Sequence, residues 1–381
     1  MKRKLYLHIG CEKTGTTSIQ DCLYINRDNL KKYGYYFLQS MGPKNNRKLT
    51  CYSIKEKVDD GLYQNLLNKF SNNENIKKHI EEELEKEILN LDNSIENVLI
   101  SSEHFSSRLF LEEELLSLKD LLDRFFEEIT IICYFREQSK ACQSLFSTGI
   151  KSGSSKSFDF YVKDCNPKNS YYNYLNMARI WSNVFGRSNL NLRIFERKNF
   201  KDGSVLNDFF SLINPNLIFN LTIPKPLNES LNTLGQDLGL EVNLKFNNLP
   251  QTEANLKLKS QILNLISKNF IGKGYCVKKE DFDRIYNEFE KDNIELNTLL
   301  GQGSLNCFEY QIPQSNIESE KTNFYYFFVE FLNLLINEKE YDINLYYKLE
   351  KNLEMLTNLE RINFNSLKQI RKIREFNKKN P

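Results

Sequence analysis

The sequence predicts an α/β fold, in which helices flank a parallel β-sheet on both faces. Four short apolar runs have the length of buried strands and are separated by stretches with helical periodicity: Leu5–Ile9, Val98–Ser101, Ile129–Tyr134 and Leu190–Phe195. Strands that alternate with helices form βαβ units, whose sheet is parallel and buried on both sides. A glycine-bounded loop after the first strand supports this interpretation, because such loops join a strand to a helix in α/β proteins.

The connections between these strands differ in character. Residues 38–92 begin as a polar, irregular stretch and continue as a charged helix around Ile76–Leu91, which we expect to lie as an insertion over the sheet. The next connection, Leu111–Phe126, repeats leucine and phenylalanine at intervals of three and four residues, as on an amphipathic helix. Toward the C-terminus the pattern becomes helical. We therefore predict one domain over residues 1–302 and a helical C-terminal extension over residues 303–381.

Composition excludes several classes of protein. The chain has 381 residues, of which 40% are hydrophobic and 27% charged, as in ordinary globular proteins. A formal net charge of +2 gives no global field that would attract nucleic acid or a membrane surface. No apolar run is long enough for a membrane span or a signal peptide, and the eight cysteines form no CxxC pair. We expect free thiols, no histidine-rich metal centre and a cytoplasmic location, and the Lys-, Asn- and Ile-rich composition suggests a bacterial source.

The residues GCEKTGTTS, at Gly10–Ser18, follow the first strand and lead into a helical stretch. A glycine-bounded turn at this place directs backbone N–H groups and the positive end of a helix toward one point, where phosphate or sulfate binds. The nucleoside-triphosphate loop G-x-x-x-x-G-K-[ST] has the same glycine spacing, but here its lysine position is Thr16 and the lysine has moved to Lys13. No apolar strand closes on an aspartate that would hold magnesium. The loop therefore predicts phosphate binding without the groups needed for chemistry on ATP.

A second polar pair follows the third predicted strand. Arg136 comes directly after that strand, in the first turn of a helix that we expect to start near Gln138, and Ser144 lies eight residues further on. Arginine makes bidentate, charge-assisted hydrogen bonds to phosphate, and a serine hydroxyl adds one more. An arginine at a strand end is equally often a structural ion-pair partner. The position of the pair at the carboxyl end of a parallel strand favours a role in ligand binding, because such folds bind their ligands there.

Together, the KTGTTS loop and the Arg136–Ser144 pair resemble the sulfotransferase family, whose enzymes use 3′-phosphoadenosine 5′-phosphosulfate (PAPS) and release 3′,5′-bisphosphoadenosine (PAP). The sequence is similar to bacterial, carbohydrate-type members of this family. The similarity extends to Ile150–Gly153, Tyr171–Gly186, Leu192–Phe210 and Asn228–Leu231. The resemblance covers about residues 4–302. It implies a P-loop NTPase-like α/β fold and transfer of a sulfuryl group from PAPS to a hydroxyl group, on a glycan or glycoconjugate, without a metal ion.

The resemblance also implies a role for each motif residue. Lys13 would contact the bridging and sulfuryl oxygens, while Arg136 and Ser144 would bind the 3′-phosphate. The 5′-phosphate would be bound through backbone N–H groups and hydroxyls of five consecutive residues: Thr14, Gly15, Thr16, Thr17 and Ser18. The physics of the reaction agrees, because sulfuryl transfer requires in-line positioning, stabilisation of negative charge and a base for the acceptor hydroxyl.

The candidates for that base lie in the segment SSEHFSSR after the second predicted strand, where Glu103 and His104 stand at the carboxyl end. Members of the family use either residue type, and we favour Glu103 because carbohydrate-type members typically use a carboxylate. Either residue also fits a structural role, as a helix cap or as a partner of Arg108. His8, on the first strand, could face the sulfuryl group as well, but a histidine on a buried strand is more often a core residue.

The sequence is also compatible with three other functions. A non-catalytic module of the same fold would bind PAPS or a glycan without turnover, and a P-loop kinase would require ATP and magnesium. A nucleic-acid-associated protein would use the basic end of the chain, residues 361–381, although such a run is more often a solvated face. We further expect Trp181 and the tyrosines before it to pack in the core, and Phe324–Ile336 to form a packed helix or the seam of a homodimer.

Overall fold

The computed structural model describes residues 3–55, 60–224, 230–312 and residue 328. The chain divides into two compact units. The first consists of the described parts of Met1–Ala141, Asn166–Asn228 and Ile285–Tyr310. The second contains Cys142–Cys165 and the described part of Glu229–Arg284. Every predicted site residue except Ser144 belongs to the first unit.

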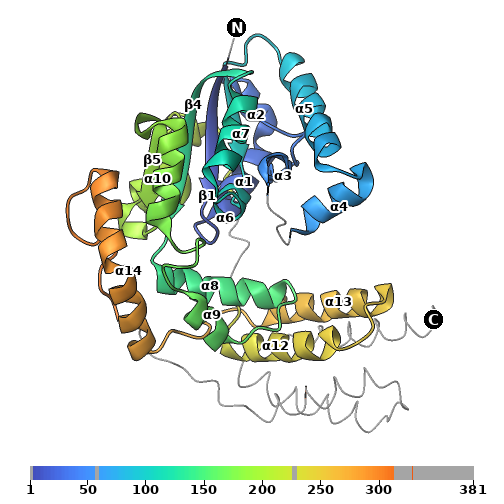
Figure 1. The fold of residues 1–381 in the computed structure, drawn as a ribbon, viewed down its shortest axis with the longest axis vertical. Coiled ribbons are helices and arrows are strands. Elements are labelled where there is room, and N and C mark those ends of the chain that lie inside the picture. Colours follow the sequence, from blue (N-terminus) through green and yellow to red (C-terminus); the bar gives the residue numbers. More distant parts are fainter. Residues whose placement is uncertain (1–2, 56–59, 225–229, 313–327, 329–381) are drawn as a thin grey trace. The chain divides into compact units, whose positions relative to one another are not determined.

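The first unit contains a five-stranded sheet with the strand order β2-β3-β1-β4-β5. Strands β1, β4 and β5 of this sheet are labelled in Figure 1. Every pair of neighbouring strands is parallel. The strands are β1 (Arg3–Gly10), β2 (Tyr35–Phe37), β3 (Asn97–Ser101), β4 (Phe126–Phe135) and β5 (Leu190–Ile194). The four predicted strands are confirmed, and so is the α/β class. Strand β2 was missed because it has only three residues, too few to show a period.

Helices cover both faces of this sheet. Leu5 and Leu7 of β1 belong to one core and His8 points to the other, because side chains alternate along a strand. The first core is closed by α3 (Lys48–Ser53), α4 (Gly61–Phe70), α5 (Asn73–Leu89), α7 (Glu112–Leu122) and α10 (Tyr174–Phe185). The second is closed by α1 (Thr16–Ile25), α2 (Arg27–Lys31) and α11 (Val205–Ser211). The predicted amphipathic helix is α7, which ends before β4 begins.

The segment 38–92, expected as an insertion, is the connection between the parallel strands β2 and β3. Its charged helix is α5, which buries one residue per turn at a spacing of four: Ile76, Ile80, Leu84 and Ile88. The side chain of Asn72 caps the helix by accepting a hydrogen bond from the N–H of Asn75 at 2.8 Å. Helix α5 therefore packs into the core of the sheet while its charged residues face outward.

The second unit is helical in its described part. It contains most of α8 (Gln138–Lys151), together with α9 (Phe158–Asp164), α12 (Thr233–Asn247), α13 (Glu253–Asn269) and the start of α14 (Lys279–Leu300). These helices confirm the predicted change from strands to helices along the chain. Residues 303–312 have no helix or strand, and the rest of the predicted extension, including Phe324–Ile336 and the basic end, lies outside the described residues except for residue 328. The domain boundary at residue 302 stays a prediction.

Short 3-10 helices complete the first unit at Arg187–Asn189, Arg197–Asn199, Lys201–Gly203 and Ile218–Asn220. Within the described segments, no helix has both the length and the apolar character needed to cross a membrane. All eight cysteines are free thiols, as expected. Trp181 is buried and stacks on Phe185 with ring centroids 5.2 Å apart, which confirms its predicted place in the core.

Candidate functional site at the carboxyl edge of the sheet

Three of the predicted motifs begin at one edge of the sheet. In a parallel sheet all strands end at the same edge, and here β1 leads into Gly10–Ser18, β3 into Ser102–His104 and β4 into Arg136. Strand β1 lies between β3 and β4, and the chain changes its direction across the sheet beside β1. Open α/β sheets bind their ligands at such a switch point, outside the carboxyl ends of the strands.

The loop after β1 has the backbone of an anion-binding nest. Lys13 and Gly15 have left-handed conformations, with φ of 65° and 76°, and Thr14 between them does not. When successive residues alternate in this way, their N–H groups converge on one point and form a concavity that attracts anions. Gly15 is required here, because a Cβ atom would lie 3.2 Å from the ring of Phe195 on a backbone that side chains rarely adopt.

Helix α1 adds its positive end to the nest. It begins at Thr16 directly after Gly15, no side chain caps it, and its first turn contains no acidic residue. The first N–H groups of a helix lack intrahelical partners and favour an anion. The predicted phosphate-binding residues 14–18 thus lie together in the nest and the first turn of α1. The hydroxyl of Thr14 donates a hydrogen bond to the Cys11 carbonyl at 2.6 Å, so that hydroxyl holds the loop.

Arg136 fastens this loop to the end of β4. Its Nη1 donates a hydrogen bond to the carbonyl oxygen of Lys13 at 3.0 Å, and its guanidinium lies over the ring of Phe195 at 5.9 Å from the centroid. Burial lowers the pKa of Arg136, although a guanidinium stays protonated in proteins. Sequence reasoning placed Arg136 near bound phosphate but missed its contact with the Lys13 backbone, because a side chain to carbonyl bond across 123 positions leaves no sequence signal.

The start of α8 is as predicted, at Gln138, but Arg136 precedes the helix instead of lying in its first turn. Glu137 separates the two and caps the helix: its carboxylate accepts hydrogen bonds from the N–H groups of Ser139 at 2.8 Å and Lys140 at 2.9 Å. This carboxylate occupies the helix end that a phosphate would otherwise use. Ser144 lies on α8 but in the second unit, so its pairing with Arg136 at one 3′-phosphate stays a prediction.

Glu103 lies against the phosphate loop. It follows β3 and precedes the short helix α6 (His104–Arg108), and its carbonyl accepts hydrogen bonds from the hydroxyls of Ser106 and Ser107 at 2.9 and 3.2 Å. A Cβ atom on Gly10 would lie 3.0 Å from the Cα of Glu103. Gly10 therefore lets the ends of β1 and β3 approach closely, and the predicted base and the predicted anion site share one corner of the sheet.

The side chain of Glu103 is not a helix cap, since it makes no capping hydrogen bond to α6. Its Oε2 instead accepts hydrogen bonds from the amides of Gln20 at 2.7 Å and Asn45 at 3.1 Å. The alternative structural role, pairing with Arg108, is also not what the structure shows, because Arg108 binds Asp60. The carboxylate is thus held by neutral donors and remains a candidate base.

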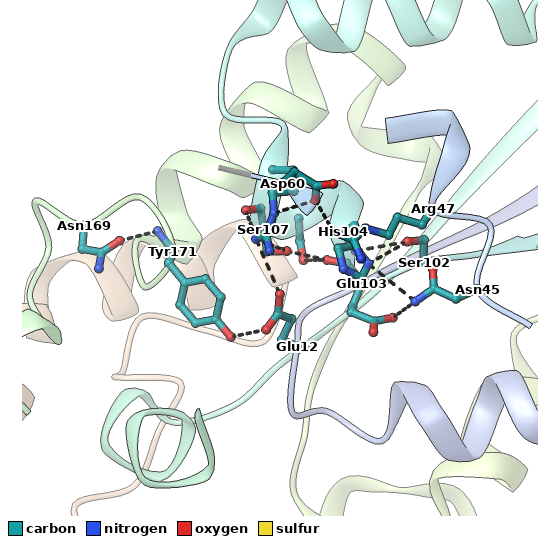
Figure 2. A network of polar contacts seen from close by, with 12 residues as sticks. Glu12, Asn45, Arg47, Asp60, Ser102, Glu103, His104, Ser107, Asn169 and Tyr171 are labelled. Carbon is teal, nitrogen blue, oxygen red and sulfur yellow. Dashed lines mark hydrogen bonds and ion pairs between the residues drawn. The ribbon is translucent and has the colours of Figure 1, made fainter. Parts of the chain in front are cut away.

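His104 stands beside Glu103 with its Nδ1 3.3 Å from the Ser102 hydroxyl and 3.5 Å from the Asn45 amide (Figure 2). Burial lowers the pKa of His104, and the nearby Glu103 carboxylate opposes that effect only in part. The imidazole is therefore neutral at neutral pH and could also accept a proton. The structure brings both candidates for the base to the same place, as predicted, and leaves both with suitable chemistry.

A charged network, also drawn in Figure 2, surrounds these residues. Asp60 is buried and binds Arg47 and the Nε of Arg108, the latter at 3.3 Å. Burial alone would raise the pKa of Asp60, but the hydrogen bonds from Arg47 and from the backbone of Tyr63 lower it below its ordinary value. The carboxylate is therefore ionised and balances two arginines at the edge of the site.

This network reaches the phosphate loop through Glu12. The Nη1 of Arg108 lies 3.8 Å from one oxygen of Glu12, and the Tyr171 hydroxyl donates to the other at 3.3 Å. Tyr171 was predicted to pack in the core, and the sequence missed its contact with the loop. Asp60 and Arg47 were missed as well, because they lie in the connection between β2 and β3 where no recognised pattern applies. The only available signal was the position of that connection between two strands that end at the site.

His8 is a core residue, as favoured from the sequence. Its imidazole is 1% exposed, packs edge-on against the rings of Phe209 and Tyr134, and has its Nδ1 2.8 Å from the Ser101 hydroxyl. Burial lowers its pKa to about 3. A neutral, enclosed imidazole of this kind contributes packing on the α1 face of the sheet.

The chain was compared with protein-family models, curated proteins and solved structures. No family model matches the chain. A curated protein of Archaeoglobus fulgidus, described as an uncharacterized protein, is 24% identical over 241 residues, which are 59% of this chain and 64% of that protein. The match thus spans less than two thirds of the relative's length. Among solved structures, the sulfotransferase from Alicyclobacillus acidocaldarius is similar with a TM-score of 0.41 and 11% identity, over 79% of this chain and 97% of that one. A TM-score this low establishes neither a shared fold nor a shared function.

The fold and the site together define an α/β protein with a nest-shaped loop at the switch point of a parallel sheet. A carboxylate and a neutral imidazole adjoin that loop.

Proposed function

We propose that this protein transfers the sulfuryl group of PAPS to a hydroxyl group of an acceptor, a glycan or glycoconjugate. The observation that carries the proposal is the contact between the nest and the proposed base: Gly10 of the loop packs on Glu103. A phosphosulfate held in the nest and an acceptor hydroxyl beside Glu103 would then be neighbours, which is the arrangement that an in-line transfer requires.

The loop fits the 5′ end of PAPS for two reasons. A nest followed by an uncapped helix start offers several N–H donors and no negative side chain in the first turn of the helix. Lys13 stands inside the nest, where its ammonium group would stabilise the charge that grows on the bridging oxygen as the sulfuryl group leaves. PAPS supplies the activated sulfuryl group, and the protein supplies donors, a cation and a base.

Glu103 would take the proton from the acceptor hydroxyl, with His104 as the second candidate. General base catalysis of this kind contributes roughly 10²–10⁴-fold to the rate. The interpretation as an ATP-dependent kinase is weaker, because Thr16 replaces the lysine that follows the second glycine in ATP-binding loops. Ser144, together with Arg136, would distinguish PAPS from ATP through the 3′-phosphate.

Calorimetric titration with PAP, in parallel with ATP and magnesium, tests the donor site. We expect micromolar binding of PAP and little affinity for ATP. Transfer is then measured with ³⁵S-labelled PAPS and a panel of hydroxyl acceptors that contains mono- and oligosaccharides. Preferential binding of ATP with magnesium would contradict the proposal in favour of a kinase, and PAP binding without transfer to any acceptor or to water would indicate a non-catalytic module.

Lys13→Ala tests the chemical role of the loop. We expect turnover to fall about 10²–10³-fold, as for other groups that stabilise transition-state charge, while PAP still binds. Lys78→Ala, on the exposed side of α5, is the matched control and should retain full activity. Near-normal turnover of Lys13→Ala would remove Lys13 from the mechanism.

A further inference from the structure

Glu103 is held in an unusual way for a carboxylate beside two arginines. Among the residues that the structure describes, no lysine or arginine forms an ion pair with it, and only its Oε2 takes hydrogen bonds. Both donors are side-chain amides, from Gln20 at 2.7 Å and Asn45 at 3.1 Å. Arg47 and Arg108 are instead bound to Asp60.

The two amides come from different parts of the first unit. Gln20 lies on α1, the helix that begins in the phosphate loop, and it is 6% exposed. Asn45 lies between β2 and α3, next to Asn46, which is fully buried and accepts a hydrogen bond from the N–H of Ser101 at 2.9 Å. The position of Gln20 is therefore set by helix α1. The position of Asn45 is set by the hydrogen bond between its neighbour Asn46 and the end of β3.

The geometry leads us to infer that Gln20 and Asn45 are positioning residues, which hold the Glu103 carboxylate by Oε2 so that Oε1 is presented to the acceptor hydroxyl. This inference rests on the proposed function, because it needs Glu103 to act as the base. Two donors on one oxygen fix the rotation of the carboxylate, and a general base must meet its proton within about 2.6–3.2 Å. A misplacement of about 1 Å can cost on the order of 10²-fold in rate.

The choice of neutral donors has a chemical reason. A lysine or arginine paired with Glu103 would compete with the acceptor proton for the carboxylate, because charge-assisted hydrogen bonds are about twice as strong as neutral ones. Asp60 takes up both nearby guanidinium groups and so keeps them from pairing with Glu103. The site thus orients the base with amides and keeps the cations on a separate carboxylate.

A double-mutant cycle tests the inference. Gln20→Met keeps the length of the side chain and removes the donor, and we expect turnover of PAPS to fall about tenfold or more. The KM for PAPS and the Kd of PAP should stay unchanged, since neither depends on the base. In a Glu103→Gln background the same substitution should change turnover by less than about twofold, because residues that act through one another are not additive. Turnover is measured as PAP release with the best acceptor of the panel, or with water where no acceptor is used.

The controls separate positioning from folding. Asn45→Leu should reproduce the behaviour of Gln20→Met, and Gln64→Met, at an exposed position on α4, should have no effect. Equal losses from Gln20→Met in both backgrounds, or no loss in the parent background, would overturn the inference. A parent protein that binds PAP but never turns over PAPS would overturn it together with the role of Glu103, whereas failure to bind PAP would overturn the proposed function itself. The unfolding midpoint of each variant shows whether a loss reflects the native protein.

Discussion

The ends of β1 and β3 meet at the same corner of the sheet but are built differently. After β1, nine consecutive residues, Gly10–Ser18, form the nest and the start of α1. After β3, Glu103 and His104 contact side chains from two other segments, Gln20 of α1 and Asn45 of the connection between β2 and β3, as well as the neighbouring Ser102. The first site is local in sequence and the second is distributed.

This difference separates two kinds of function. An anion site can be built from backbone N–H groups, whose direction is set by the local φ and ψ angles, so a short motif is sufficient. A base needs a side chain with a defined orientation, surroundings and charge balance, and these come from tertiary contacts. We therefore expect substitution of the side chains after β3 to lower turnover without weakening PAP binding, whereas Arg136→Ala, which removes a contact that holds the loop after β1, should weaken binding.

The largest expected effect is that of Glu103→Gln. Turnover should fall roughly 10²–10⁴-fold, because the amide cannot accept the acceptor proton, while PAP binding stays within about twofold of the parent. His104→Ala should cost less, about tenfold, through the loss of a neighbour that shares the Asn45 amide. The measurement is the rate of PAP release at saturating PAPS. A larger loss for His104→Ala than for Glu103→Gln would assign the base to His104.

An intermediate effect is expected at Arg136, which follows β4 and contacts the loop after β1 through the carbonyl of Lys13. Arg136→Ala removes the hydrogen bond to the Lys13 carbonyl, so 5′-AMP should bind about three- to tenfold more weakly, in line with a net loss of roughly 1 kcal/mol. PAP should lose more, because a 3′-phosphate would also lose a charge-assisted partner. Calorimetry with both ligands measures the excess. Equal losses of affinity for PAP and 5′-AMP would show that Arg136 holds the loop in place but does not bind the 3′-phosphate.

The difference between a local and a distributed site also determines which features could be predicted from the sequence. The four longer strands, the loop that joins β1 to α1, and the position of Glu103 and His104 after β3 followed from apolar runs and from short motifs, since their residues are contiguous. Strand β2, the Arg136–Lys13 contact and the network around Asp60 could not be predicted. Each of them depends on side chains far apart in the chain, or on a strand too short to show a period. His8 was predicted correctly because burial on a central strand is itself a local property.

The last expected effect is one on stability, for Asp60→Asn. Its carboxylate has no exposed surface and binds Arg47 and Arg108, so the substitution should lower the free energy of unfolding at pH 7 by about 1–3 kcal/mol. The pKa of Asp60 is lowered in the folded protein from an ordinary value of 3.8. The stabilisation is therefore complete above that value and is lost as the pH falls through the lower folded-state pKa.

Denaturant unfolding of the parent and of Asp60→Asn between pH 7 and pH 2 should show two curves that converge only in the most acidic part of that range. Glu85→Gln, at an exposed position of α5 in the same unit, should leave the unfolding curve nearly unchanged. PAP affinity should also be unchanged in Asp60→Asn, because the nest does not contact Asp60. A constant difference down to pH 2, or a loss of PAP binding, would mean that the network after β3 also supports the loop after β1, and the separation between the two strand ends would not hold.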